Sequence, residues 1–215
     1  MKTKIGIIAP TYNRPDFARL LALQMKNQTL CTDLIAFHQN GTVDSYEWAV
    51  KDIDLPYKWI HTPNQINQEE WYAKPIEALL EVDCTHFFWC DHDDIYISQH
   101  IEKGMKLLEE YDHVVNEHSG MLLLKKEYVY QPNKIFTAHD PGGMSSSMCF
   151  NRNFAIKLLS DLRNNVELKE NRLYYADQVV RRVTMPGFKC LLNKEDATTV
   201  YVCHSGTVSS SHWLE

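Results

Sequence analysis

The stretch Thr85-His86-Phe87-Phe88-Trp89-Cys90-Asp91-His92-Asp93-Asp94 organises this sequence. Its first six residues are mostly apolar and aromatic, and a short run of this kind predicts a buried β-strand. Three carboxylates follow within four positions, so negative charge is concentrated where the strand ends. Because alternate side chains of a strand lie on one face, we expect Asp91 and Asp93 to point together.

Two carboxylates held this close repel each other unless a positive charge lies between them. A hard divalent cation with oxygen ligands is the usual solution, and open α/β sheets bind ligands at the carboxyl ends of their strands. The stretch therefore predicts a metal site for a phosphorylated ligand. A simpler interpretation stays open, because an acidic cluster is often a solvated turn and Asp93-Asp94 could cap a following helix.

Length and composition favour one globular domain in a reducing compartment. The 215 residues are enough for a substantial core, and a net charge of -6 argues against a general polyanion-binding protein. The six cysteines form no C-x-x-C pair, so neither a zinc knuckle nor a redox motif is indicated. No secretory signal and no apolar stretch long enough for a transmembrane segment is found, and we expect a cytoplasmic protein.

Strands and helices alternate along the first half of the sequence. A continuous apolar run predicts a buried strand at Ile5–Ala9, a second strand is expected at Leu34–Phe37, and Tyr57–Ile60 is typical of a third. Apolar residues at helical spacing predict three helices: one that begins near Pro15, one from about Glu69 to Val82, and one at Ile97–Leu108. Pro75 is an unfavourable residue inside the second helix. This alternation predicts a mostly parallel sheet with helices on both faces.

The second half is less regular. It predicts, in order, a strand at Met121–Tyr130, a loop at Asp140–Gly143, helices at Asn151–Arg163 and Tyr175–Val183, and a last strand at Val200–Val202. No internal repeat or linker divides the chain.

Besides the acidic stretch, five short motifs stand out: Ile7–Arg14, Asn40–Asp44, Gly142–Arg152, Ala176–Arg181 and His204–Ser209. In this order and approximate spacing, over nearly the whole sequence, they resemble the motifs of the family 2 glycosyltransferases. The resemblance implies the GT-A fold, an α/β domain whose mostly parallel central sheet is flanked by helices. It also implies one domain, 1–215, in which about 1–95 bind the nucleotide-sugar and about 96–215 bind the acceptor.

The resemblance implies that the donor is held mainly by the first half of the chain. The donor-binding residues that it implies are Pro10, Tyr12, Arg14, Gln39, Asn40, Lys74 and Asp91. Asp93, in the D-x-D motif, is expected to bind the metal directly, and His204 could add a nitrogen ligand. Carboxylates with an imidazole suit Mn²⁺ as well as Mg²⁺. A histidine hydrogen-bonded within a loop is the alternative for His204.

On the acceptor side, the resemblance implies that Gly142, Gly143 and Met144 bind the acceptor and that Asp177 is the catalytic base. A carboxylate must accept the proton of the attacking hydroxyl, and attack opposite the leaving diphosphate would invert the anomeric centre. The alternative for Asp177 is an exposed carboxylate paired with Arg181 at helical spacing. The acceptor itself stays open among a glycan, a lipid-linked sugar, a protein and a modified nucleic-acid base.

Two positions depart from the family pattern. Gln39 stands where an acidic residue commonly reads uracil, and an amide can both donate and accept. Ala176 replaces the first acid of the E/D-D pair.

A haloacid-dehalogenase-like phosphatase, a sugar nucleotidyltransferase and a non-catalytic nucleotide-sugar or carbohydrate-binding protein remain alternatives. The phosphatase normally has its aspartates after the first strand, and the nucleotidyltransferase usually has a glycine-rich loop where this chain has Pro10–Asn13.

Overall fold

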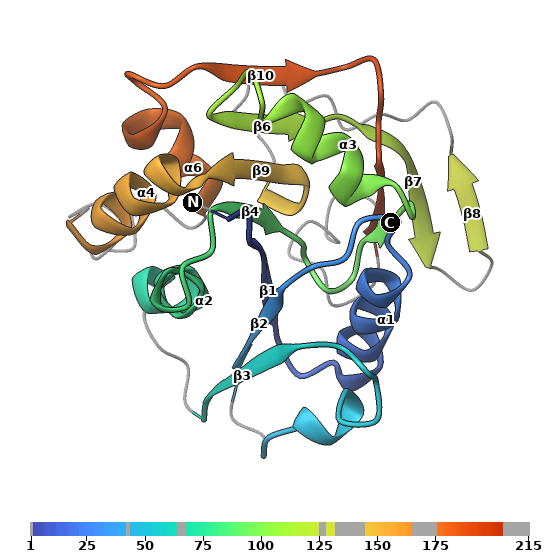
Figure 1. The fold of residues 1–215 in the computed structure, drawn as a ribbon. Coiled ribbons are helices and arrows are strands. Elements are labelled where there is room, and N and C mark those ends of the chain that lie inside the picture. Colours follow the sequence, from blue (N-terminus) through green and yellow to red (C-terminus); the bar gives the residue numbers. More distant parts are fainter. Residues whose placement is uncertain are drawn as a thin grey trace.

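This computed structural model describes residues 2–41, 44–63, 68–124, 128–131, 145–164 and 176–203. They form a seven-stranded sheet of order β10-β6-β9-β4-β1-β2-β3 and a four-stranded sheet of order β5-β11-β7-β8. Figure 1 shows helices α1 and α3 on one face of the large sheet and α2, α4 and α6 on the other. The predicted α/β architecture is therefore confirmed.

The first half of the chain builds the parallel part of the large sheet. Its strands are β1 (Ile5–Thr11), β2 (Leu34–Asn40), β3 (Tyr57–Thr62) and β4 (His86–Trp89). They are connected through α1 (Pro15–Lys26), the short 3₁₀ helix η1 (Glu47–Ala49) and α2 (Gln68–Glu81). Every residue of β1 is buried, as expected for a parallel strand covered on both faces.

The second half adds shorter elements in a less regular order. They are β5 (Ile95–Tyr96), α3 (His100–Leu107), β6 (His113–Asn116), β7 (His118–Leu124), β8 (Tyr128–Gln131), the 3₁₀ helix η2 (Ser145–Ser147), β9 (Met148–Asn151), α4 (Arg152–Asn164), α6 (Ala176–Val179), the π-helical turn η3 (Val180–Thr184), β10 (Cys190–Asn193) and β11 (Thr199–Cys203). No helix in these described ranges could span a bilayer.

Two predictions for the second half were wrong. The single strand expected at Met121–Tyr130 is two antiparallel strands, β7 and β8. No strand was expected between the loop at Asp140–Gly143 and the helix from Asn151, but β9 lies there and runs antiparallel between β4 and β6. Met148, Cys149 and Phe150 are fully buried because a central strand packs on both of its faces.

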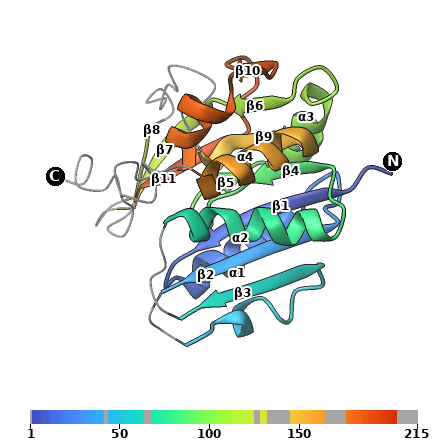
Figure 2. The same ribbon diagram turned by 90° about the vertical axis from the view of Figure 1, so that its left-hand side faces the viewer.

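The strand order reverses between β1 and β4. From β1 the chain moves outward to β2 and β3, and α2 then returns it to the other side of β1, where β4 pairs in parallel. Figure 2 shows β1, β2 and β3 pointing to the left, toward the side where β7, β8 and β11 lie. In open α/β sheets, ligands bind at such a switch point, beyond the carboxyl ends of the strands.

Two apolar clusters fix the helices on the sheet. Phe87, Trp89 and Phe150 pack with residues of α2 and α4 on one face, whereas Phe37 and Phe88 pack with residues of α1 and α3 on the other. The close approach of α3 depends on Gly104, since a Cβ there would lie 2.4 Å from Cε1 of Phe88.

Candidate functional site

Polar side chains are buried where the parallel strands of the large sheet end. The residues that share this position are Thr11, Gln39, Asn40, Thr62, Asn116, Glu117 and Asn193. A buried polar group costs free energy unless a partner satisfies it, so their concentration at one edge requires either internal hydrogen bonds or a ligand.

The acidic stretch Asp91–Asp94 is a turn that follows β4. The strand ends at Trp89, and the N–H of Asp94 points back to the carbonyl oxygen of Asp91 at 3.4 Å. We had expected strand alternation to point Asp91 and Asp93 to the same face. Because both residues follow the strand, that alternation does not determine their orientation. The capping alternative is also wrong, because α3 begins only at His100.

The three aspartates of this turn differ in burial and bonding. Asp94 is 2% exposed, and its Oδ1 accepts a hydrogen bond from the N–H of Val202 in β11 at 2.9 Å. Its carbonyl oxygen accepts a second one from Nε2 of Gln24 in α1 at 3.1 Å. Asp94 therefore ties the turn to two other elements, while Asp91 and Asp93 are only half-buried.

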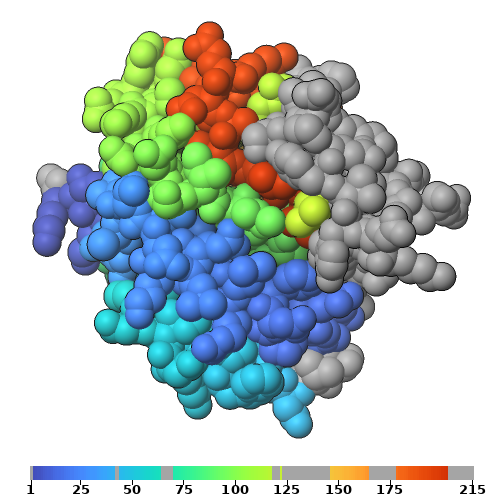
Figure 3. Space-filling view, turned by 90° about the vertical axis from the view of Figure 1, so that its right-hand side faces the viewer, coloured from blue at the N-terminus to red at the C-terminus, as the bar shows by residue number. Residues whose placement is uncertain are grey.

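The space-filling view shows the same junction. In Figure 3, the green surface of residues that follow β4 lies between the blue surface of α1 and the orange-red residues near the end of the described chain. Oδ1 of Asp91 accepts a hydrogen bond from Nε1 of Trp89 at 3.1 Å, which orients that carboxylate. The ring of His92 packs edge-on against Phe17 of α1 at 5.9 Å, so this histidine contributes to packing between the turn and α1.

The predicted metal ligands are only partly described. Asp93 lies in the turn, whereas His204 lies outside the described residues. β11 ends at Cys203, and the N–H of its Val202 donates to the acidic turn at Asp94. Within the described ranges, no group of three His, Cys, Asp or Glu side chains is placed to hold a metal ion.

Tyr96 and Cys90 are buried residues next to the acidic turn. The hydroxyl of Tyr96 lies 3.2 Å from the carbonyl oxygen of Asp91 and 3.0 Å from that of Ser146, and it can donate its hydrogen to either one. Burial raises the pKa of Tyr96 and that of the Cys90 thiol well above their usual ranges. Both groups stay protonated at neutral pH, so neither is a base or a nucleophile.

The turns after β1 and β2 touch each other. Asn13 has a φ of 48°, Gly41 has a φ of 151°, and a Cβ on Gly41 would lie 2.3 Å from Oδ1 of Asn13. The positive φ favours glycine at position 41, and any side chain there would require the Asn13 amide to move. Within the predicted nucleotide loop, Pro10 is buried, Tyr12 is 46% exposed, and the guanidinium of Arg14 lies over the Phe17 ring at 5.9 Å.

The structure distinguishes the two amides that were predicted to read the nucleobase. Gln39 is fully buried, its Nε2 donates to the carbonyl oxygen of Asp44 at 3.1 Å, and its Oε1 accepts from the N–H of Tyr46 at 3.1 Å. Its amide thus holds the loop before η1. Asn40 is 3% exposed, and its Oδ1 is buried without a hydrogen-bond partner in the described chain. Asn40 is the better placed of the two to meet a ligand N–H.

Pro75 lies inside α2, and a histidine satisfies the carbonyl that this proline leaves without a helical partner. Proline has no N–H to donate to residue 71. Instead, Nδ1 of His38 lies 2.9 Å from the carbonyl oxygen of Trp71, and its Nε2 lies 3.0 Å from Oγ1 of Thr62. Since a carbonyl only accepts, Nδ1 carries the proton. Burial lowers the pKa of His38 to about 4, so the imidazole is neutral.

This contact holds the first turns of α2 against the end of β2. Lys74 lies in this part of α2 and is half-buried, with its Nζ 4.0 Å from a carboxylate oxygen of Glu70. The neighbouring aromatic residues belong to the core: Trp71 stacks on Tyr72 at 5.4 Å, and Tyr72 packs against Trp89 at 5.6 Å. These contacts show that Trp71 and Tyr72 pack on the apolar core that covers this face of the sheet.

The predicted acceptor side is less completely described. Gly142, Gly143 and Met144 lie outside the described residues. The backbone of Asp177 belongs to α6, but its side chain is not described, so its role as base stays a prediction. α6 continues into the π-helical turn η3, and Thr184 at its end donates to Oδ2 of the buried Asp161 at 2.8 Å.

Sequence reasoning missed one buried acid at this edge. Glu117 directly follows β6 and is 7% exposed. The run His113-Val114-Val115-Asn116-Glu117, apolar residues followed by polar ones, is the same signal that marks β4 and its acidic turn, only shorter.

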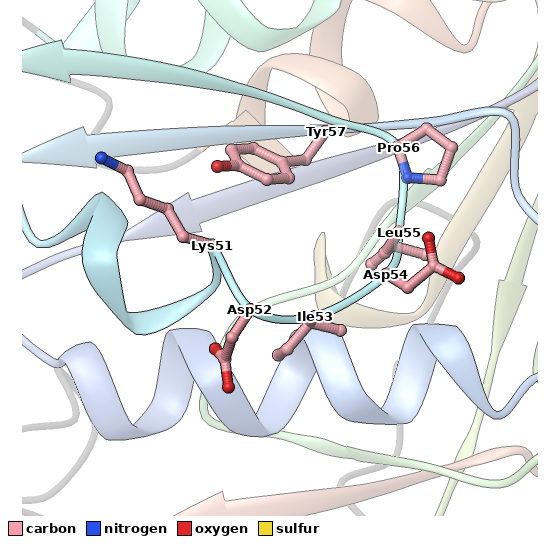
Figure 4. A pocket seen from close by; sticks show the side chains of 7 residues that line it. All are labelled: Lys51, Asp52, Ile53, Asp54, Leu55, Pro56 and Tyr57. Carbon is pink, nitrogen blue, oxygen red and sulfur yellow. The ribbon is translucent and has the colours of Figure 1, made fainter.

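A shallow surface hollow of about 570 Å³ is lined by residues 51–57. Figure 4 shows these side chains along the loop between η1 and β3. The loop enters β3 at its amino end, and the hollow is therefore separate from the edge described above.

Solved structures show which fold this is. The chain is similar to S. aureus TarS 1-349 in complex with UDP-GlcNAc, with a TM-score of 0.63 and 12% identity over 99% of this chain and 62% of that one. A second TarS structure gives a TM-score of 0.57 and 14% identity over 93% of this chain and 37% of that one. The chain thus spans less than two-thirds of the length of these TarS structures.

A 4-diphosphocytidyl-2C-methyl-D-erythritol synthase is also similar, with a TM-score of 0.59 and 11% identity over 92% of this chain and 91% of that one. No family model matches the chain, and no curated protein matches it either. Identities this low show the fold alone. The fold is a GT-A-like nucleotide-sugar transferase fold, as the sequence resemblance had implied.

Proposed function

We propose that this chain is a glycosyltransferase that moves a sugar from a nucleotide-sugar to an acceptor hydroxyl. The observation that supports this most is the position of the acidic turn: Asp91 and Asp93 follow β4 next to β1, at the switch point of a GT-A-like fold. TarS, a structural neighbour, is described in complex with UDP and with UDP-GlcNAc, which supports a nucleotide-sugar as the donor.

The donor would lie across the ends of β1, β2 and β4. Oδ1 of Asn40 can accept an N–H of the nucleobase, since it is buried and has no partner within the described chain. Arg14 and Lys74 can pair with the phosphates as cations. Asp91, which Trp89 orients, can accept hydrogen bonds from the ribose. Pro10 and Tyr12 would shape the loop around the base and ribose.

A divalent cation fits the chemistry of the acidic turn. Asp91 and Asp93 are half-buried carboxylates in one short turn, and their hard oxygen donors suit Mn²⁺ or Mg²⁺. Asp93 would bind the ion, with His204 as an additional ligand. When bound, the ion would neutralise charge on the departing diphosphate.

Asp177 would act as the general base. The acceptor hydroxyl forms a bond to the anomeric carbon, its proton passes to the Asp177 carboxylate, and the bond to the nucleoside diphosphate breaks. Gly142, Gly143 and Met144 would line the acceptor side. Attack opposite the diphosphate would invert the anomeric configuration.

Calorimetry of UDP binding with and without MnCl₂ tests the proposal. We expect UDP binding to require Mn²⁺. The affinity should fall about 10- to 100-fold in Asp93→Ala, which corresponds to the loss of one hydrogen bond or contact to a charged group. Asp54→Ala is the matched control, because Asp54 is an exposed aspartate in the loop before β3. Equal, metal-independent affinity in both variants and the parent would contradict the assignment. GDP and CDP titrated in parallel would identify the nucleobase.

A sugar nucleotidyltransferase is the second candidate, because the similar diphosphocytidyl-methylerythritol synthase is matched over 91% of its length. The absence of glycine from Pro10–Asn13 favours the glycosyltransferase. Release of pyrophosphate from a nucleoside triphosphate and a sugar phosphate would support the nucleotidyltransferase. Release of nucleoside diphosphate from a nucleotide-sugar would support the glycosyltransferase, and binding without either release would indicate a non-catalytic protein.

A further inference from the structure

The acidic turn is held in place by side chains from outside it. The backbone bond inside the turn, from the N–H of Asp94 to the carbonyl oxygen of Asp91, is long at 3.4 Å and therefore weak. Metal ligands must nevertheless be held within about 0.5 Å of their working positions before the ion binds. The residues that bond to the turn from outside therefore decide whether its carboxylates are preorganised.

Gln24, in the last turn of α1, bonds to the backbone where the acidic turn leads into β5. Its Nε2 donates to the carbonyl oxygen of Asp94 at 3.1 Å, and its Oε1 accepts from the N–H of Tyr96 at 2.7 Å. Both ends of one side-chain amide are thus used on one three-residue segment. This segment cannot slide along α1 without breaking both bonds.

The side chain of Tyr96 reaches back to the beginning of the turn. Its hydroxyl lies 3.2 Å from the carbonyl oxygen of Asp91 and 3.0 Å from that of Ser146. Tyr96 and Ser146 are each 4% exposed, so water does not compete for these bonds. Ser146 comes two residues after Met144 in the sequence. One hydroxyl therefore joins the proposed metal turn to the segment that follows the predicted acceptor residues.

The face of α1 that contains Gln24 also contacts the middle of the turn. Phe17 and Gln24 are seven residues apart, which is about two helical turns, so they lie on the same side of α1. The Phe17 ring packs against His92 at 5.9 Å. The turn is therefore attached to α1 at His92 and at Asp94, the two residues that flank Asp93.

We propose that Gln24 and Tyr96 are positioning residues, which fix the acidic turn in the arrangement that binds a divalent cation together with a nucleoside diphosphate. Gln24 fixes the end of the turn, and Tyr96 fixes its beginning. Both act through the protein backbone, to which their polar groups are bonded, and not by touching the ligand. This inference rests on the proposed function, since it assumes that Asp93 binds the cation.

The first test is amide hydrogen exchange by NMR without metal or nucleotide. Gln24→Met keeps a side chain of similar length but loses both bonds, and the N–H of Tyr96 loses its acceptor. We expect this N–H to exchange about 10- to 30-fold faster, because one hydrogen bond changes an equilibrium about fivefold. Tyr96→Phe removes the hydroxyl alone and should speed exchange at Asp94 about fivefold.

Gln28→Met is the matched control for Gln24→Met. Gln28 lies four residues further along; its Nε2 lies 3.2 Å from the carbonyl oxygen of Gln24 and 3.0 Å from that of Ile97, and its Oε1 accepts from the N–H of Ile101 at 3.1 Å. Gln28 is 7% exposed, so its replacement should lower the melting temperature at least as much. Exchange should become faster at Ile101 and not at Tyr96.

The second test is calorimetry with MnCl₂ and UDP, or whichever of GDP and CDP binds the parent more tightly. We expect the affinity to fall about 10- to 30-fold in Gln24→Met and about fivefold in Tyr96→Phe, because binding must then order the turn. The Mn²⁺ concentration for half-maximal binding should rise in both. Gln28→Met should bind like the parent, and so should Tyr57→Phe, which removes a hydroxyl bonded to Glu47 at the amino end of β3.

Two results would overturn this inference. In the first, Gln24→Met weakens nucleotide binding no more than Gln28→Met does, so that any effect comes from lost stability. In the second, exchange at Tyr96 is no faster in Gln24→Met than in the parent. If a nucleoside diphosphate binds the parent and either result is found, only the positioning inference is wrong. If none of the three nucleotides binds the parent with MnCl₂, the proposed function is wrong and this inference fails with it.

Discussion

Replacing His38 by phenylalanine, in the parent and in Pro75→Ala, tests how the helix that contains Lys74 is held on the sheet. The imidazole donates to the Trp71 carbonyl because Pro75 has no N–H to do so. A phenylalanine of similar shape removes this bond and the bond to Thr62. Alanine at position 75 restores an N–H that can reach the same carbonyl.

The magnitude follows from the bonds that are lost. Two hydrogen bonds contribute about 1 kcal/mol each, and leaving the buried carbonyl and hydroxyl unsatisfied adds about 1–3 kcal/mol. We therefore expect His38→Phe to lower the free energy of unfolding by about 3–5 kcal/mol. In the Pro75→Ala background the carbonyl is satisfied, so the same change should cost about 1–2 kcal/mol less.

Urea unfolding at pH 7.5 of the four proteins in this double-mutant cycle measures the coupling. The UDP affinity of each variant then shows whether the position of α2 matters for the donor. The reasoning would be refuted if the two changes were additive within about 0.5 kcal/mol, the usual limit for independent sites. The Trp71 carbonyl would then not be the group that links His38 to Pro75.

The pH dependence of the same variant gives an independent check. The folded pKa of His38 is about 4, below the ordinary value of 6.5, so the folded state resists protonation. Its contribution is fully present above pH 6.5 and is lost as the pH falls toward 4, by about 3 kcal/mol. His38→Phe should therefore lose less stability than the parent over this range.

Three further predictions concern other buried groups and the base. Asp94→Ala should lower the free energy of unfolding by about 1.5–3 kcal/mol and speed hydrogen exchange at Val202, whereas Asp94→Asn keeps the acceptor and should do less. Asp177→Asn should retain UDP binding but lower transfer about 10²–10⁴-fold; near-parental turnover, or retained anomeric configuration, would exclude it as the base. Burial lowers the pKa of His113 to about 3, so this histidine should account for about 4 kcal/mol of the stability that the parent loses between pH 6.5 and about 3.5. His113→Phe should lack this loss in urea titrations, and an equal dependence of the free energy of unfolding on pH in both proteins would contradict the prediction.

The sequence predicted the elements whose signal is local. β1, β2 and β4 contain short apolar runs, β3 alternates apolar with polar residues, and the structure contains all four strands, some extended by polar residues such as Gln39 and Asn40. β9 was missed because only Met148, Cys149 and Phe150 mark it, and its partners β4 and β6 are far away in sequence. Pairing between distant segments determines such a short strand, and hydrophobic periodicity cannot reveal it.

The site shows the same limit. The acidic turn was recognisable because three carboxylates follow one strand, but which of them is buried depends on β11, more than 100 residues later. Gln39 and Asn40 are adjacent amides in sequence, and only the loop at Asp44–Tyr46 shows that Gln39 is already bonded. Glu117 was missed because a single acid after a short strand has no distinctive pattern.

The burial of Asp94 changes the electrostatics of the acidic turn. A cluster of three ionised carboxylates would repel strongly, but the Val202 N–H lies against the Asp94 carboxylate and stabilises its charge locally. Asp91 is stabilised in the same way, although more weakly, by the Trp89 indole N–H. Asp93 is the carboxylate that we propose as the ligand of a cation at this turn. For this reason Asp93→Ala should affect metal-dependent UDP binding, whereas Asp94→Ala should first affect the attachment of β11.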